Sequence, residues 1–297
     1  MHPSKDIIGS RGRRLAGKRI ALGICGSVAA FKAPELARVL MRHGAEVRTV
    51  MSEKATEIIS PQLMEWATGN EVVCGLTGKI EHVEVAKWAD VVLIAPATAN
   101  TVGKMAHGID DTAVTSLASV AIGLRKPVIV VPAMHASMYD HPAVRENIAR
   151  LRGMGVEVVE PKMEEGKAKF PDPEAILWVV VGAVTEKDMR GLRVLVTAGP
   201  TVEPVDSVKF ITNPSSGKMG IAFARAAAVR GADVTLIYGP GSEPAPDGVR
   251  VIRVKTTKEM KEAFDSAAGE GPDIVVDAAA PPAFAVEAPV EGQPGAE

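Results

Sequence analysis

Small and hydroxyl-bearing residues follow several apolar segments of this sequence, at positions where a ligand could bind. Gly26 and Ser27 come after the apolar run Arg19–Ile24 and open a helical pattern. Their N–H groups and hydroxyl could therefore face a phosphate at a helix N-terminus. The pattern is not Gly-x-Gly-x-x-Gly, and Ser52 rather than an acidic residue follows the next apolar run, so a dinucleotide site is disfavoured. Alone, this turn fits a phosphate site and an ordinary tight turn equally well.

The segment IAPATANT at 94–101 is a stronger candidate for a binding site. Its apolar run leads directly into Thr98, Ala99 and Asn100, and residues this small allow a flat ring to approach the backbone. Ligands of open α/β sheets lie beyond the carboxyl ends of the strands. The alternative interpretation is an ordinary helix cap, because Thr98, Asn100 and Thr101 all suit that role.

Two histidines stand near these segments. His82 precedes a helical stretch ahead of IAPATANT and could act as an acid or base near neutral pH, although a lone histidine is more often a surface or core residue. His135 lies with Met134 and Met138 in PAMHASMY, directly after the apolar run 128–131. This second segment is either packed core or the rim of an active site.

A further candidate lies in FITNPSSGKMG at 210–220. Ser215, Ser216, Gly217 and Lys218 stand at a predicted helix start and resemble an anion-binding nest. The segment is not a Walker P-loop, because Thr212 occupies the position of its first glycine. Alternatively, Lys218 is simply a solvated helix residue.

Short β-branched runs alternate with helical patterns along the chain, which predicts a parallel sheet covered by helices. The runs are apolar throughout, as expected for strands buried on both faces. Between them, APELARVLMRHG predicts a helix that ends at Gly44 and is kinked after its first turn by Pro34. The predicted strands are Arg19–Ile24, Glu46–Met51, Val91–Ala95, Val128–Val131 and Val156–Val159.

The pattern restarts in the second half of the chain. LRVLVTAGPT and AFARAAAVRGADVTLIYGP repeat the order of KRIALGICGS and ELARVLMRHGAEVRTVMS: basic residue, buried strand, glycine turn, helix and next strand. We therefore predict one domain over 1–188 and a second, incomplete one over 189–297. The Pro-, Gly- and Glu-rich tail from about 281 is expected to be disordered.

Composition excludes several classes of protein. The 297 residues are 46% hydrophobic, and the 34 basic and 36 acidic residues nearly balance, so neither nucleic acid nor a membrane surface is expected as a partner. The two cysteines, Cys25 and Cys74, do not suggest a disulfide framework and fit a reducing cytoplasm. The apolar run at 175–184 is about half a membrane span.

These motifs together resemble the bifunctional proteins of coenzyme A biosynthesis that join phosphopantothenoylcysteine decarboxylase to phosphopantothenate–cysteine ligase. The first half is similar to the flavin-dependent cysteine decarboxylases through Gly26–Lys32, His82, Pro96–Thr101 and Pro132–Tyr139. The second half is similar to the ligase through VLVTAGPTVEPVDSVKFITNPSSGKMG. The likeness extends from about residue 17 to about residue 280.

The resemblance implies a flavodoxin-like or Rossmann-like doubly wound sheet, followed by a partial Rossmann-like α/β domain. It implies FMN as cofactor, because a cysteine carboxyl can leave only when its electrons have a sink, which oxidation of the thiol to a thioaldehyde provides. The substrate would be 4'-phosphopantothenoylcysteine and the product 4'-phosphopantetheine, in a homotrimer or a multiple of trimers. The implied FMN-binding residues are Gly26, Ser27, Val28, Ser52, Thr98, Ala99 and Ala133. The implied catalytic residues are His82, Asn100, His135, Met138 and, in the ligase, Asn213.

For the second half, the resemblance implies ligation of 4'-phosphopantothenate to cysteine with CTP and Mg²⁺, through an acyl-nucleotidyl intermediate that Asn213 stabilises. Ala283 stands where the family has Asp, and EGQPGAE replaces its lysine-rich segment, so we expect impaired ligation. The implied substrate-binding residues are Gly199, Ser215, Ser216, Gly217 and Lys218. No metal-ligating residue is assigned.

The first half also departs from the family pattern. His135 and Tyr139 replace the Asn and Trp of the family motif, and the flap region KMEEGKAKFPDPEAI lacks the cysteine thought to protonate the product. Lys167, Lys169, Glu165 or water could take its place. Two alternatives stay open: a fully bifunctional enzyme completed by another chain, and a non-catalytic flavin-binding regulatory subunit.

Overall fold

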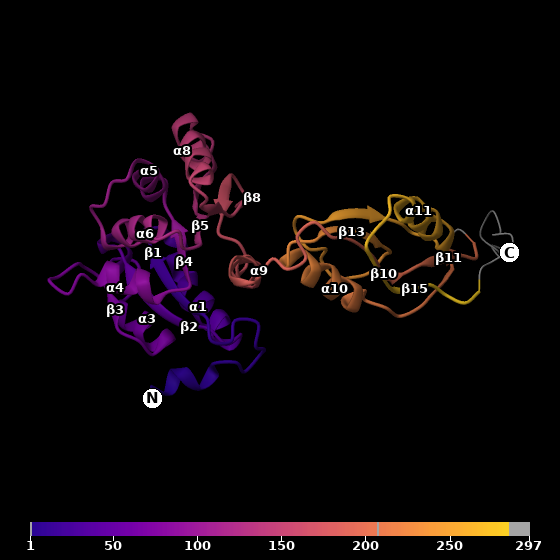
Figure 1. The fold of residues 1–297 in the computed structure, drawn as a ribbon, viewed down its shortest axis with the longest axis horizontal. Coiled ribbons are helices and arrows are strands. Elements are labelled where there is room, and N and C mark those ends of the chain that lie inside the picture. The colour runs from indigo at the N-terminus through magenta and orange to yellow at the C-terminus, as the bar shows by residue number, and fades with distance from the viewer. Residues whose placement is uncertain (1, 207, 285–297) are drawn as a thin grey trace, which may run out of the picture. The chain divides into compact units, whose positions relative to one another are not determined.

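The computed structural model describes residues 2–206 and 208–284. The chain divides into two compact units, Met1–Val184 and Thr185–Glu297, which are described separately (Figure 1). In the described residues no helix is both long enough and apolar enough to cross a membrane.

Unit 1 is built on a parallel six-stranded sheet in the order β3-β2-β1-β4-β5-β7. The chain order reverses at β1 and β4, which is the switch point of a doubly wound sheet. The predicted doubly wound parallel fold is therefore confirmed. The strands are β1 (Arg19–Ile24), β2 (Glu46–Met51), β3 (Val72–Val73), β4 (Val91–Ala97), β5 (Val128–Pro132) and β7 (Glu157–Val158).

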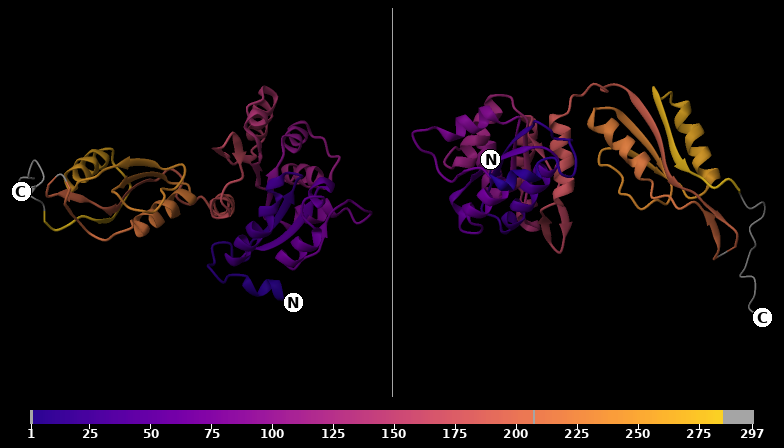
Figure 2. Two further views of the ribbon diagram at one scale, coloured as in Figure 1. Left: turned by 180° about the vertical axis from the view of Figure 1, so that it is seen from behind. Right: turned by 90° about the horizontal axis from the view of Figure 1, so that it is seen from below.

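Helices cover both faces of this sheet (Figure 2), which explains why β4 is buried along its whole length. One layer packs α1 against α3 and α9, and the other packs α6 against α4 and α5, with α8 on α5. The helices are α1 (Ala33–Arg42), α2 (Glu53–Thr56), α3 (Pro61–Thr68), α4 (Glu81–Trp88), α5 (Ala99–His107), α6 (Ala113–Gly123), α7 (Ala136–Tyr139), α8 (Pro142–Gly153) and α9 (Pro173–Val184). Two 3₁₀ helices, η1 (Pro3–Ile7) and η2 (Val28–Lys32), complete the unit.

The structure corrects the expectation that Pro34 kinks a helix. The 3₁₀ helix η2 ends at Lys32 and α1 begins at Ala33, so Pro34 lies in the first turn of α1. Proline is tolerated there because an N–H at that position has no intrahelical partner. At the other end, Gly44 follows the helix with a φ of 103°.

A second, small sheet in unit 1 joins two segments that are distant in sequence. It has the order β6-β9-β8, from β6 (Met134–His135), β8 (Lys162–Glu164) and β9 (Lys167–Lys169). β6 follows the carboxyl end of β5 directly, so this sheet stands at the same edge of the main sheet.

Unit 2 repeats the first half of the unit 1 topology with four parallel strands in the order β14-β13-β10-β15. Two helices, α10 (Lys218–Val229) and α11 (Thr257–Gly269), pack on this sheet, and a hairpin of β11 (Val202–Pro204) and β12 (Phe210–Thr212) extends from it. The strands are β10 (Arg193–Pro200), β13 (Asp233–Tyr238), β14 (Arg250–Arg253) and β15 (Ile274–Ala280).

The internal repeat is visible in an Arg–Asp contact that occurs in both units. The backbone N–H of Arg19 donates to Asp90 Oδ2 at 2.8 Å, and the backbone N–H of Arg193 donates to Asp273 Oδ2 at the same distance. In both units this contact ties the start of the first strand to the start of the strand beside it.

Candidate active site

The carboxyl ends of β1, β2, β4 and β5 place five sequence-predicted residues at one edge of unit 1. The Ser27 hydroxyl donates to the Ala133 carbonyl at 3.2 Å, and the Ala133 N–H donates to Ala97 O at 2.9 Å. The Ser52 N–H donates to Ile24 O at 3.0 Å. The turns after four strands are therefore bonded to one another, and Gly26, Ser27, Ser52, Thr98 and Ala133 lie together.

Hydroxyl groups at this edge cap helices. Ser27 Oγ accepts from the Ala29 N–H, and Ser52 Oγ accepts from the Ala55 N–H. Thr98 Oγ1 accepts from the Thr101 N–H at 3.2 Å at the start of α5. The capping interpretation of Thr98 is thus correct, and it does not compete with a binding role. Capped helix N-termini at one edge carry partial positive charge, which suits a phosphate.

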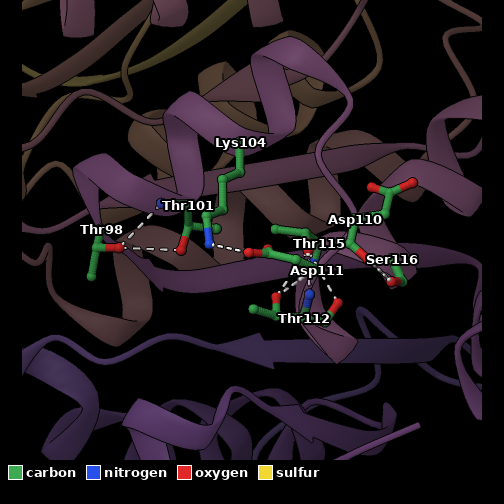
Figure 3. Close-up of polar contacts among 8 residues, drawn as sticks. All are labelled: Thr98, Thr101, Lys104, Asp110, Asp111, Thr112, Thr115 and Ser116. Atoms are coloured by element: carbon green, nitrogen blue, oxygen red, sulfur yellow. Dashed lines mark hydrogen bonds and ion pairs between the residues drawn. The ribbon is translucent and has the colours of Figure 1, made fainter.

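The contacts in Figure 3 hold α5 in place behind this edge. Lys104 Nζ donates to Asp111 Oδ2 at 2.6 Å, from the body of α5 to the loop that follows it. Thr112 and Thr115 form a capping box at the start of α6, so the loop is held at both ends. Asn100 lies exposed in the first turn of the helix that these contacts support.

His82 lies in the first turn of α4, not ahead of a helix as its sequence suggested. α4 ends at Trp88, just before β4 begins, so its first turn points back towards the carboxyl edge of the sheet. The His82 side chain is half-buried, and its Nδ1 atom is buried without a hydrogen-bond partner among the described residues. A buried polar atom without a partner is costly, which makes this nitrogen a candidate to meet a ligand or a water. Arg38 Nη1 and Thr49 Oγ1 share this property among the described residues.

The PAMHASMY segment divides between core and surface. Tyr139 is buried and its hydroxyl donates to Glu160 Oε2 at 2.8 Å, whereas Met138 is 49% exposed and His135 is exposed. Met134 is half-buried and joins His135 in β6. Tyr139 belongs to the packed core and Met134 packs against it, whereas His135 and Met138 lie at the surface.

Cys25 also lies at this edge, although its sequence position alone did not mark it as a site residue. Burial raises the pKa of its thiol to about 11, while contacts with Thr101 and Thr98 act in the opposite direction. The group is therefore a protonated thiol that packs between the ends of β1 and α5. Its position directly before Gly26, at a strand end, was the available sequence signal.

A cavity of about 520 Å³ in unit 1 lies away from this edge. Lys126, Pro127 and Val128 line it at the start of β5, which is at the amino edge of the sheet. At the carboxyl edge, by contrast, Val28 and Phe31 of η2 are 78% and 61% exposed. Two neighbouring apolar side chains this exposed make this surface a candidate for contact with another group.

In unit 2, the predicted ligase residues converge around the start of α10. Gly217 has a φ of 81°, and the Ser215 and Ser216 hydroxyls accept from the N–H groups of Gly217 and Lys218 at 3.4 and 3.3 Å. Asn213 Nδ2 donates to Pro281 O at 2.9 Å and to Ala280 O at 3.3 Å, so it holds the end of β15.

Tyr238, which the sequence did not single out, organises this nest. Its side chain is fully buried, and its hydroxyl donates to Ser216 O at 3.2 Å and to Glu243 O at 2.8 Å. A Cβ atom at Gly199 or Gly217 would stand 2.9 or 2.6 Å from the ring, so only glycine allows this close packing.

Comparisons with known proteins agree with this division of the chain. A family model described as Flavoprotein matches residues 8–185, and one described as DNA/pantothenate metabolism flavoprotein C-terminal domain matches residues 189–293. The coenzyme A biosynthesis bifunctional protein CoaBC of Thermococcus kodakarensis is 51% identical over 292 residues, which cover 97% of this chain and 72% of that protein. The protein of the same name from Methanocaldococcus jannaschii is 38% identical over 97% of this chain and 70% of its own length.

Among solved structures, the FMN-dependent cysteine decarboxylase SpaF aligns with a TM-score of 0.51 and 34% identity. The alignment covers 57% of this chain and 97% of SpaF.

Proposed function

The chain belongs to the family of bifunctional coenzyme A biosynthesis flavoproteins, and we propose that unit 1 uses FMN to decarboxylate 4'-phosphopantothenoylcysteine to 4'-phosphopantetheine. The observation that carries this proposal is the bonded edge where the turns that hold Ser27, Ala97 and Ala133 meet. His82 Nδ1, which has no hydrogen-bond partner among the described residues, adds a candidate acid–base group in the same unit. Free cysteines and balanced charge are consistent with a reaction in the cytoplasm.

The residues at this edge suit FMN. Capped helix N-termini provide donors for the phosphate, and Gly26, Ala99 and Ala133 leave room for a flat ring. The exposed Val28 of η2 provides apolar surface for that ring. When bound, FMN supplies a two-electron sink that lets the substrate carboxyl leave as CO₂.

The protein side chains bind and orient the substrate. Asn100, exposed at the first turn of α5, donates its amide N–H to the substrate carboxylate. His82 takes the thiol proton or stabilises the charge that develops on sulfur. Met138 covers the apolar part of the bound substrate, because half of its side chain is exposed beside His135.

The exposed Val28 and Phe31 support a flavin site shared between subunits of a homotrimer, or of a multiple of trimers. Light scattering of the flavin-loaded protein is expected to give a mass that is a multiple of three chains. A monomer that retains flavin would contradict this assembly.

Ligation of 4'-phosphopantothenate to cysteine with CTP and Mg²⁺ is the second candidate activity, supported by the nest at Ser215, Ser216 and Gly217. We expect it to be weak, because Ala283 offers no carboxylate where the family has Asp. CTP-dependent pyrophosphate release, measured with cysteine present, tests this expectation. A robust rate would favour the fully bifunctional alternative.

The decarboxylase assignment is tested with the purified full chain. We expect a yellow protein with a flavin absorbance band that releases CO₂ from 4'-phosphopantothenoylcysteine. Failure to retain added FMN would refute the assignment. Retained FMN without CO₂ release would favour the non-catalytic regulatory subunit.

A further inference from the structure

The small sheet β6-β9-β8 brings His135 beside a hairpin that is distant in sequence. Met134 pairs with Ala168 and His135 pairs with Lys167 in antiparallel register. The Ala136 N–H donates to Gly166 O at 3.0 Å, and Gly166 is one of the two positive-φ residues of the hairpin turn. The position of His135 relative to this flap is thus set by main-chain contacts.

The ring of His135 is oriented by its neighbour Ser137. Nδ1 lies 2.8 Å from Ser137 Oγ and 3.3 Å from Ser137 N. The Ser137 N–H donates to Nδ1 of the neutral ring, and the hydroxyl can accept from Nδ1–H when the ring is charged. No hydrogen bond occupies Nε2 among the described residues, which leaves Nε2 as the atom that can release a proton.

His135 also lies next to the proposed flavin site. It is two residues beyond Ala133, whose carbonyl accepts from the Ser27 hydroxyl at 3.2 Å. A group attached to this segment can therefore reach a substrate held over the ends of β1 and β5.

The proposed reaction, on which this inference rests, requires a proton at carbon. Loss of CO₂ leaves an enethiolate, and the carbon that carried the carboxylate must be protonated before the two electrons can return to the substrate. We propose that His135 is the residue that donates this proton, from Nε2.

Protonation at carbon converts the enethiolate to a thioaldehyde. The Nε2–H bond of the imidazolium breaks and leaves its electron pair on nitrogen, and the new C–H bond forms from the carbon–carbon double-bond pair. A sulfur pair then forms the C=S bond of a thioaldehyde. When bound, FMN would supply the two electrons that reduce the thioaldehyde carbon, and sulfur would take its proton from water.

Three other acids near the flap, Tyr139, Lys169 and Glu165, hold their protons too tightly or have none to give. Burial and the bond to Glu160 raise the pKa of Tyr139 to about 12. Hydrogen bonds that Lys169 donates to Glu165 and Glu164 raise the pKa of Lys169, and Lys169 in turn lowers the pKa of Glu165. Imidazole, in contrast, ordinarily exchanges its proton near neutral pH.

The decisive variant is His135→Asn, which keeps a good helix cap and the hydrogen-bonding amide of the family motif. Under anaerobic single-turnover conditions we expect CO₂ release to continue, while 4'-phosphopantetheine formation falls by about 100-fold or more. The product should be the enethiol, which lacks two hydrogen atoms by mass spectrometry, and the flavin absorbance should stay bleached.

The control is His141→Asn, because His141 caps α8 through Nδ1 in the same way, with the Ala143 N–H at 3.2 Å. It should behave like the unaltered chain. If His135→Asn forms the reduced product at the unaltered rate, or if Lys167→Met accumulates the enethiol instead, His135 is not the donor. Absence of CO₂ release from the unaltered chain would refute the proposed function itself.

A measurement without flavin checks the ring geometry. Long-range ¹H–¹⁵N spectra of histidine-labelled protein should show that the ring of His135 can carry protons on both nitrogens, with the signal assigned by its loss in His135→Asn. A ring that stays neutral over the whole pH range in which the chain is active would overturn the proposal, because no imidazolium would then be present to release a proton.

Discussion

β4 and β15 occupy equivalent positions in the two units, yet they differ in burial. Each pairs with the first strand of its sheet, on the side opposite the second strand. β4 is buried throughout because β5 pairs with its other edge, whereas no described strand pairs with the other edge of β15, and Ile274 and Val275 are exposed. The repeated local pattern therefore specifies the first strands of each sheet. Burial of the strand beside the switch point also requires a neighbouring strand on its outer edge.

The largest expected effect separates the two units by function. His82→Asn should lower the CO₂ release rate by about 100-fold or more, because the candidate acid–base group is lost. Flavin content and the thermal transition of unit 2 should not change. His107→Asn, at an exposed position of α5, is the control. Equal rates for the two variants would exclude His82 from the reaction.

Two glycine substitutions should each introduce a steric clash in one unit and leave the other unit unchanged. A Cβ atom at Gly26 would stand 2.5 Å from Lys54 Cβ, and one at Gly220 would stand 2.4 Å from Ala198 Cβ. Overpacking of this kind costs about 1–3 kcal/mol. Gly26→Ala should therefore weaken FMN retention, and Gly220→Ala should lower only the unfolding temperature of unit 2.

The controls for this pair are Gly78→Ala and Gly269→Ala, where a Cβ atom would meet nothing within 4 Å. Calorimetry and flavin absorbance follow both units in the same sample. Loss of flavin from Gly220→Ala would show that the units are energetically coupled.

The two tyrosines of the chain allow a smaller comparison. Tyr238→Phe removes the one O–H that two carbonyl oxygens of the nest share, and Tyr139→Phe removes a hydrogen bond to Glu160, whose side chain is 67% exposed and can bond to water instead. A lost hydrogen bond costs about 1 kcal/mol, and acceptors left without a donor add to that cost. Denaturant unfolding should show a larger loss for unit 2 with Tyr238→Phe than for unit 1 with Tyr139→Phe. The reverse order would argue against Tyr238 as the organiser of the nest.

The smallest expected effect concerns the repeated ion pair and its dependence on pH. The hydrogen bond from Arg19 lowers the pKa of Asp90, so this contact stabilises the fold above the ordinary carboxyl pKa of about 3.9 and is lost as pH falls through the lowered value. Asp90→Asn should reduce the unfolding temperature of unit 1 at neutral pH by a few degrees at most, and the difference should vanish in acid.

Asp273→Asn should have less effect, because Arg193 Nε lies 3.9 Å from the carboxylate, compared with 3.0 Å between Arg19 Nη2 and Asp90 Oδ1. Scans at several pH values, with Asp247→Asn as an exposed control, measure this difference. If the difference in unfolding temperature persists at pH values below the pKa of the carboxyl group, the effect arises from packing and not from charge.

Much of the fold was predictable because continuous apolar runs specify buried parallel strands. β1 and β2 have the predicted bounds, and β4 and β5 extend only slightly beyond theirs. The prediction was wrong at Pro34, because a sequence pattern does not distinguish a 3₁₀ turn followed by a new helix from one kinked helix. The two-residue edge strand β3 has too little pattern of its own to be recognised.

The sequence by itself determined which residues follow strand ends, and since parallel strands end at one edge, it also determined that Ser27, Thr98 and Ala133 would lie near one another. Only the tertiary structure decided that His135 pairs with Lys167, that Tyr139 contacts Glu160, and that His82 Nδ1 lacks a partner. The physical reason is that local patterns set backbone conformation and burial, whereas the choice among distant partners depends on the packing of the whole unit.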